Sequence, residues 1–196
     1  MILDLIKKAK RSVLGTNNSR DFLLKTMPQG SVCAEIGVYK GDFSKDILRT
    51  VKPSRLHLID PWKYMQEYED ALYGGKAGSQ DIMEAIFNNV KRRFDIDILR
   101  GSVVINRGLS DAVSKSFNND YFDWVYIDGN HTYEYVKMDL ECYYPKVKKG
   151  GFIAGDDYIS DRWWKDGVNK AVDEFVASGK VKVVMIKNGQ FILMKI

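Results

Sequence analysis

The residues best suited to chemistry stand at the end of one apolar run. In the stretch "VYIDGNHTYEYVKMDL", Asp128 and His131 follow the apolar residues that begin at Val125. A charged group is costly inside a protein core, so a buried strand that ends in "DGNH" has either reached solvent or arrived at a site. The bland alternative is a turn, because Asp, Gly and Asn all favour turns. The other strand ends must decide between these interpretations.

Acidic residues follow several of the other apolar runs as well. Glu35 lies near the end of the first run, Asp60 ends the second, and the pair Asp156 and Asp157 ends the last run before the C-terminal tail. Ligands bind at the carboxyl ends of the strands in an open parallel sheet. A single acid could be a turn or helix-capping residue, but acids at four strand ends favour a shared site.

Two glycines, Gly37 and Gly41, flank the turn after the first apolar run. They would let the backbone pass close to a ligand, with the N-terminus of the next helix directed at it. The G-x-G-x-x-G pattern of dinucleotide sites is incomplete, because Tyr39 stands where that pattern has its second glycine. Asp60 lies about 20 residues further on, the separation at which an acid on the second strand can hydrogen-bond a ribose. Together these features predict a nucleoside pocket.

Alternating strands and helices are needed to position these residues. Short apolar runs predict buried parallel strands at 31–38, 55–60, 97–102, 122–129 and 150–157. Apolar residues at helical spacing predict helices over 41–51, 79–94 and 133–147. The tail "KVVMIKNGQFILMKI" has Asn188 and Gly189 between two apolar runs, which predicts an antiparallel hairpin. The expected fold is therefore α/β, a mostly parallel seven-stranded sheet with a C-terminal antiparallel hairpin.

Two segments fall outside this alternation, within what we expect to be a single domain over residues 1–196. Residues 1–27 are expected to form one or two helices that cap the sheet or contact a partner. Residues 61–80 form a long connection with several aromatic residues and the break "GGKAG". Because such an insertion is uncommon in a compact domain unless it covers a site or is disordered, we interpret it as a lid.

The composition is that of an ordinary globular protein and argues against several classes of function. The chain has 196 residues, 45% of them hydrophobic, and a net charge of +4 that is too small and dispersed to indicate nucleic-acid binding. No run approaches the roughly 20 apolar residues of a membrane span, and no signal peptide is visible after Met1. Cys33 and Cys142 have no metal-ligand spacing and are interpreted as buried free thiols. A cytoplasmic location is expected.

Three stretches between residues 32 and 158 resemble the motifs of one enzyme family. They are "AEIGVYKGDFS", "LHLIDPW" and "WVYIDGNHTYEYVKMDLECYYPKVKKGGFIAGDDY". They look like successive motifs of class I S-adenosylmethionine-dependent methyltransferases, most of all the small-molecule O-methyltransferases that include enzymes acting on macrolide sugars. The resemblance implies a Rossmann-like sheet and contacts of the cofactor S-adenosylmethionine with Glu35, Gly37, Tyr39, Gly41, Asp60, Ser110, Asp111 and Asp128. Asp60 would hold the ribose hydroxyls, and Ser110 and Asp111 would lie near the adenine.

The resemblance also implies a metal site and a catalytic base. Metal-dependent O-methyltransferases hold a divalent cation between an acid after the fourth strand and a pair after the fifth, a pattern that Asp128, Asp156 and Asp157 match. Three carboxylates without cysteine suit a hard cation such as Mg²⁺. In such enzymes the base lies three residues after the first ligand, here at His131. It would take the proton of a hydroxyl group on a small-molecule or sugar substrate.

Two other functions are left open at this point. Proteins with the last motif include hydroxylases of antibiotic pathways, and three acids with one histidine could hold iron. The two-histidine set that open iron sites favour is missing, because His57 falls inside a predicted strand. The third function is a nucleoside-binding module without catalysis, in which the acids are structural. No nucleic-acid or membrane partner is expected, and the chain could form a homodimer.

Overall fold

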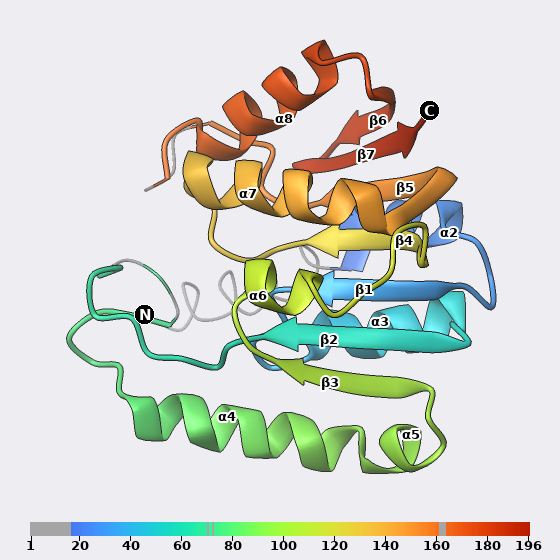
Figure 1. Cartoon of the computed structure of the whole chain (residues 1–196). Helices are drawn as coiled ribbons and strands as arrows, with labels where there is room; N and C mark the ends of the chain where they lie inside the picture. The colour runs from blue at the N-terminus through green and yellow to red at the C-terminus, as the bar shows by residue number, and fades with distance from the viewer. Residues whose placement is uncertain (1–16, 70, 72, 161–163) are drawn as a thin grey trace, which may run out of the picture.

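The structure, a computed structural model, describes residues 17–69, 71, 73–160 and 164–196. Within these ranges seven strands form one sheet: β1 Val32–Ile36, β2 Arg55–Asp60, β3 Val103–Arg107, β4 Phe122–Ile127, β5 Val147–Gly155, β6 Val181–Lys187 and β7 Gln190–Lys195 (Figure 1). The helices are α2 Asn17–Thr26, α3 Asp42–Val51, α4 Gln80–Arg93, α5 Asp95–Leu99, α6 Ser110–Ser114, α7 Tyr133–Tyr143 and α8 Gly167–Ala177, with one 3-10 turn, η1 Tyr144–Lys146.

The strand order across the sheet is β3-β2-β1-β4-β5-β7-β6. Strands β1 to β5 pair in parallel, and β7 pairs antiparallel with both β5 and β6. The order reverses between β1 and β4, where Ile36 is level with Ile59 of β2 and with Ile127 of β4. This reversal is the switch point at which open parallel sheets bind ligands, just beyond the carboxyl ends of the strands.

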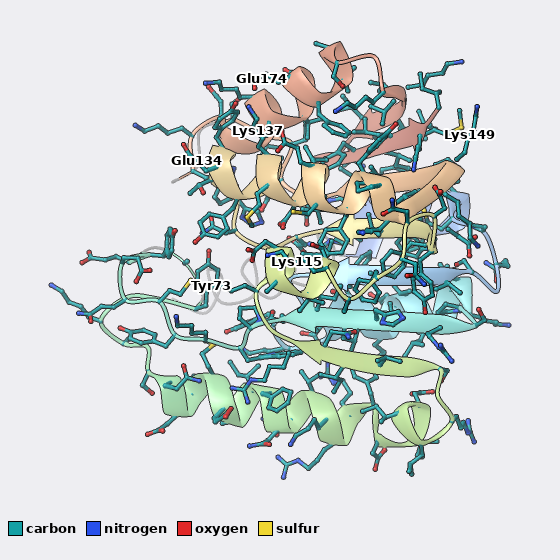
Figure 2. The ribbon with its side chains drawn as sticks, in the orientation of Figure 1. Tyr73, Lys115, Glu134, Lys137, Lys149 and Glu174 are labelled. Atoms are coloured by element: carbon teal, nitrogen blue, oxygen red, sulfur yellow. The ribbon has the colours of Figure 1, made fainter. Side chains whose placement is uncertain are left out.

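Helices cover both faces of the sheet, and each face has its own core. In Figure 1, α2 and α3 lie behind the sheet and α6, α7 and α8 lie in front of it. Side chains alternate along β4: Trp124 and Tyr126 pack in the core with α2 and α3, whereas Val125 packs with α7 and α8. At the surface Lys137 of α7 reaches toward Glu174 of α8, with Nζ and Oε2 3.5 Å apart (Figure 2). Burial on both faces explains why the central strands read as almost continuous apolar runs.

Two predictions made from the sequence are wrong. Residues 97–102 do not form a strand, because α5 extends to Leu99, a turn follows, and β3 begins only at Val103. Leu99, within the short apolar run that suggested the strand, is 87% exposed, whereas "VVINR" supplies the β-branched side chains that pack well in a sheet. A run this short does not separate a helical turn from a strand. The second error is Cys142, which is only partly buried, unlike Cys33.

The C-terminal hairpin is confirmed, and the structure adds its place in the sheet. Asn188 and Gly189 have positive φ angles of 52° and 76°, as a two-residue turn between right-twisted strands requires. The last strand, β7, inserts between β5 and β6, so β6 forms the edge of the sheet among the described strands.

Helix α2 is the described part of the region predicted to cap the sheet. It contacts α3 and β7, and Leu23, Leu24 and the following Met27 are buried in the core behind the sheet. Residues 1–16 of the predicted cap lie outside the described residues. None of the described helices is both long enough and apolar enough to cross a bilayer.

Candidate active site

A cavity of about 460 Å³ opens beyond the carboxyl ends of β1, β2, β4 and β5. Most of the residues selected from the sequence line it: Glu35, Gly37, Tyr39, Asp60, Ser110, Asp128, His131, Asp156 and Asp157. Gly41 and Asp111 are not among its lining residues. The strand ends therefore bring together, in one hollow, acids that are separated by more than a hundred positions in the chain.

Gly37 follows β1 directly and lies against the backbone that follows β4. Its φ angle is +90°, and a Cβ atom there would lie 2.1 Å from the carbonyl oxygen of Asp128. The Gly37 N–H donates to the carbonyl of Ile59, and the Asp128 N–H donates to the carbonyl of Ile36, at 2.9 and 2.7 Å. Only glycine therefore permits this packing, which brings the turn after β1 against the loop that carries Asp128.

A separate structural constraint requires glycine at position 41. Its φ angle is +74°, its N–H donates to the carbonyl of Val38 at 2.9 Å, and a Cβ there would meet the Phe94 ring at 2.8 Å. Gly41 therefore closes the turn before α3 and leaves room for the Phe94 ring, which follows α4.

Asp60 organises the turns that follow β1 and β2. Its Oδ2 accepts hydrogen bonds from the N–H groups of Val38 and Tyr39, both at 2.9 Å, and its Oδ1 accepts one from Trp62 at 2.6 Å. Burial raises the pKa of this carboxyl, and the three N–H donors act in the opposite direction. Tyr39 and Trp62 both have positive φ angles, 50° and 42°, and the Trp62 indole donates to the Tyr39 carbonyl at 2.8 Å. Backbone strain of this kind collects at functional sites.

His131 lies between two carboxylates at the cavity wall. Its Nε2 is 3.4 Å from Asp128 Oδ1, and its Nδ1 is 3.4 Å from Asp157 Oδ2. These are ion-pair distances rather than well-formed hydrogen bonds, and Nε2 is buried without a hydrogen-bond partner. Burial alone would lower the pKa of the imidazole, but Asp128, Asp157 and Asp156 outweigh burial and raise it. The ring also lies 4.8 Å, centroid to centroid, from the indole of Trp164.

The same cluster has a donor set that fits a divalent cation. One ligand atom each from Asp128, His131 and Asp157 can lie within 4.8 Å of one another. Burial raises the pKa of Asp157, His131 acts in the opposite direction, and the nearby Asp156 and Asp128 raise it further. Carboxylate oxygens suit Mg²⁺ and Mn²⁺, and an imidazole is acceptable to Mn²⁺ or iron.

Arg20 is a site residue that the sequence did not reveal. From α2, its Nη2 donates to Asp128 Oδ2 at 2.9 Å and forms a very short contact with Asp156 Oδ2. The guanidinium carbon lies 4.7 Å from the centroid of the Phe43 ring and 5.5 Å from that of Tyr126. Burial opposes the charge, but Asp128, Tyr126 and Asp156 outweigh it and raise the pKa of Arg20. No local pattern signals this role, because the partners lie far along the chain.

Asp156 is held by the protein on both of its oxygens. Oδ2 pairs with Arg20, while Oδ1 accepts hydrogen bonds from the Gln190 amide and from the Asp157 N–H, the latter at 2.8 Å. The three-atom cluster around His131 does not include this carboxylate. Asp156 and Asp157, adjacent in sequence, therefore differ in surroundings: Asp156 pairs with Arg20, whereas Asp157 lies beside His131.

Two further acids in the cavity are buried. Glu35 is 1% exposed, and burial raises its pKa to about 8 although Ser44 donates a short hydrogen bond to it. Asp139 of α7 is 3% exposed, accepts a short hydrogen bond from Ser110, and has its pKa raised to about 7 by burial. Asp139 was missed from the sequence because an acid in the middle of an amphipathic helix normally faces solvent.

The connection predicted to be a lid contributes to the cavity wall through Pro61, Lys63, Met65, Ala71 and Tyr73. Figure 2 shows Tyr73 on the loop that leads from β2 to α4. Within this connection the Tyr64 hydroxyl donates to the Gly75 carbonyl at 2.6 Å, and the Tyr68 ring packs against Tyr135 of α7 at 6.3 Å.

His57 has the structural role that its place in a strand predicts. It is 5% exposed, with Nδ1 2.9 Å from the Asn106 side-chain oxygen and Nε2 3.1 Å from the Tyr121 hydroxyl. Both nitrogens are satisfied away from the cavity. His131 is therefore the one histidine available to the site, since the chain has only two.

The strand order, with a cavity at its switch point and acids at the strand ends, defines a class I S-adenosylmethionine-dependent methyltransferase. The family model described as a methyltransferase domain matches residues 34–158, and the chain belongs to this family. The family is one of methyltransferase enzymes, which favours catalysis over the non-catalytic alternative.

Three similar proteins illustrate the relationship. The Acanthamoeba polyphaga mimivirus protein named "Uncharacterized protein R132" is 46% identical over 55 residues, which are 28% of this chain and 24% of that protein. A Staphylococcus aureus protein assigned as a caffeoyl-CoA O-methyltransferase superposes with a TM-score of 0.60 at 17% identity, over 99% of this chain and 82% of that one. The O-methyltransferase NovP gives a TM-score of 0.59 at 22% identity, over 90% and 75%. At these identities the two structures establish the shared fold.

Proposed function

We propose that the enzyme transfers a methyl group from S-adenosylmethionine to a hydroxyl oxygen of a small molecule or sugar, with His131 as the base. The observation that carries this proposal is the location of the His131 imidazole at the cavity wall, between two carboxylates. An imidazole titrates near neutral pH and can take a hydroxyl proton, which makes the oxygen nucleophilic.

The proposed reaction balances without a further reactant. The hydroxyl oxygen forms a bond to the methyl carbon, the bond from that carbon to sulfur breaks, and the hydroxyl proton goes to His131. S-adenosylmethionine supplies the methyl group and a neutral leaving sulfide. The protein positions the acceptor in line and removes its proton, and positioning of this kind can lower a barrier by several kcal/mol.

We further propose that Asp128 and Asp157 hold a divalent cation, Mg²⁺ or Mn²⁺, with His131 beside it. Such a cation, when bound, lowers the pKa of a coordinated hydroxyl group. The support is the convergence of the two carboxylates around the His131 ring, which stays outside the ligand set so that it can take the proton. Asp156, the third ligand expected from the sequence, would join only after its pairing with Arg20 is released.

The cofactor is proposed to occupy the part of the cavity between Glu35, Asp60 and Ser110. Support comes from the glycine turn at Gly37, which lines the cavity after β1, and from Asp60, the acid at the end of β2. Residues 61–80 are proposed to act as a lid that orders over the bound ligands. Five of its described residues already line the cavity, and aromatic side chains supply apolar cover.

A hydroxyl acceptor is favoured over a hydroxylase reaction by the ligand chemistry. Open iron sites favour two histidines and one carboxylate, but both nitrogens of His57 are engaged by Asn106 and Tyr121. The names of the two superposed proteins, one assigned as a caffeoyl-CoA O-methyltransferase and the other the O-methyltransferase NovP, also favour methylation of a hydroxyl group.

The test is a methyl-transfer assay on purified protein with a panel of sugars, phenols and catechols. Products carrying one added methyl group are detected by mass spectrometry, with Mg²⁺ or with a chelator. We expect O-methylation of at least one acceptor, with loss of turnover but not of cofactor binding in the His131→Ala variant. Glu141→Gln, at an exposed position of α7 away from the cavity, is the matched control. Cofactor binding without methylation of any hydroxyl, or an active His131→Ala enzyme at every pH, would contradict the proposal.

A further inference from the structure

The carboxylates at the ends of β4 and β5 already have a cation supplied by the chain. Arg20 contacts Asp128 and Asp156 through the same nitrogen, Nη2. Its side chain is 29% exposed, against 18% and 15% for the two acids, so the group is only partly screened by water. Stacking on the Phe43 and Tyr126 rings fixes the guanidinium plane in this place.

Arg20 and a divalent cation would draw on the same charges. Asp128 uses Oδ2 for Arg20, and its Oδ1 faces His131 in the cluster that could bind metal. Asp156, which the sequence pattern assigns to the metal, is instead bonded to Arg20 and Gln190. Two cations a few ångströms apart in a partly buried site repel each other strongly.

We infer that Arg20 is the built-in countercharge of this acidic site and that it opposes the binding of a divalent cation. Metal entry requires the guanidinium to give up Asp156 or to share Asp128 at an electrostatic cost. The inference rests on the proposed metal site, and it assigns to helix α2 a role in setting metal affinity. Arg20 affects the metal by neutralising Asp128 and Asp156, not by touching the metal itself.

The backbone of α2 gives this role a stable support. Leu23 and Leu24, on the same helix, are buried to 0% and 1% exposure in the core behind the sheet. Their burial holds the helix independently of the ion pair, so a change at Arg20 is expected to alter the site without detaching α2. Arg20→Met keeps the apolar length that packs on Phe43 and Tyr126 while removing the charge.

The experiment measures Mn²⁺ binding from the loss of the free-ion electron paramagnetic resonance signal. The variants are Arg20→Met, Arg20→Lys and Arg49→Met, the last removing an exposed arginine that pairs with Asp46 on α3. We expect Arg20→Met to bind Mn²⁺ at least about tenfold more tightly than wild type. Arg20→Lys, which keeps the charge, and Arg49→Met should stay near the wild-type affinity.

Thermal unfolding supplies a second readout that does not depend on activity. Without metal, Arg20→Met should unfold at a lower temperature than wild type, because Asp128 and Asp156 lose their countercharge. Saturating Mg²⁺ should restore the loss in Arg20→Met and raise the wild-type unfolding temperature much less. The Arg20→Lys protein should show neither effect.

Equal or weaker Mn²⁺ affinity in Arg20→Met would overturn the inference, as would a destabilisation that Mg²⁺ leaves unchanged. Absence of Mn²⁺ binding in every variant would overturn both the inference and the proposed metal site. Methyl transfer by the same preparations in the presence of a chelator would then show that the methyl-transfer proposal holds without the metal site and without this role of Arg20.

Discussion

Replacing Asp60 should affect folding as well as cofactor binding, because this carboxylate is the acceptor for three backbone N–H groups. Asp60→Ala leaves the donors of Val38, Tyr39 and Trp62 without their partner. A buried donor that loses its acceptor costs about 1–3 kcal/mol. Water from the adjoining cavity can reach the vacated position, so we take the lower limit for each donor and expect a loss of about 3 kcal/mol in the free energy of unfolding.

Asp60→Asn separates the contribution of the Trp62 hydrogen bond to stability from that of the Val38 and Tyr39 hydrogen bonds. The amide oxygen can still accept from Val38 and Tyr39, which share Oδ2, but the amide nitrogen then faces the Trp62 N–H, donor to donor. One unsatisfied donor predicts a loss of about 1 kcal/mol. Binding of S-adenosylmethionine should weaken about tenfold or more in both variants if Asp60 holds the ribose, since hydrogen bonds to a charged group contribute about 1.5–3 kcal/mol.

Urea unfolding, followed by far-ultraviolet circular dichroism, gives the stabilities, and titration calorimetry gives the cofactor affinity. Glu141→Gln, an exposed acid exchanged for its amide, should match wild type in both assays. The reasoning is refuted if Asp60→Ala unfolds within about 0.5 kcal/mol of wild type, the usual range for a surface substitution. Normal stability with weak cofactor binding would leave Asp60 as a ligand residue only.

Three more predictions concern other residues of the cavity. Burial raises the pKa of Glu35 to about 8, so near neutral pH this residue holds a proton in the folded state that it releases on unfolding. The free energy of unfolding of the wild type should therefore fall as pH rises from about 4.5 to 8. Glu35→Gln should show a shallower fall, measured by urea unfolding at pH 5, 7 and 9. Gly37→Ala places a Cβ 2.1 Å from the Asp128 carbonyl oxygen, so its unfolding temperature should drop sharply, whereas an unchanged value would rule out the close packing of these loops. His131→Ala should lower turnover by about 10²- to 10⁴-fold at saturating cofactor, and steady-state rates that match wild type across the pH range would remove it as the base.

The parts of the site predicted from the sequence are those encoded locally. A buried strand is a short apolar run, and an acid or glycine directly after it must lie at the carboxyl end of that strand. The positions of Asp60, Asp128 and Asp157 at one edge of the sheet followed from this rule and from the parallel arrangement of the strands. The hairpin at Asn188 and Gly189 followed from turn chemistry alone.

Two features that the sequence did not predict, helix α5 where it overlaps 97–102 and the place of β7 in the sheet, depend on information absent from the local pattern. The run at 97–102 was too short to show a helical or an alternating period, and β3 begins one residue after it. The insertion of β7 between β5 and β6 depends on which strand edges remain unpaired once the parallel sheet has formed, so no property of the tail sequence reveals it.

The sequence by itself determined the fold class, the edge of the sheet that carries the site, and the acids and histidine that stand there. Tertiary structure alone decided how those charges are balanced. Arg20 reaches Asp128 and Asp156 across 108 and 136 positions of the chain. Asp60 is committed to backbone donors of two turns, and Asp139 is buried beside Ser110. A charge responds to every group within several ångströms in space, whereas sequence spacing describes only the neighbours along one element.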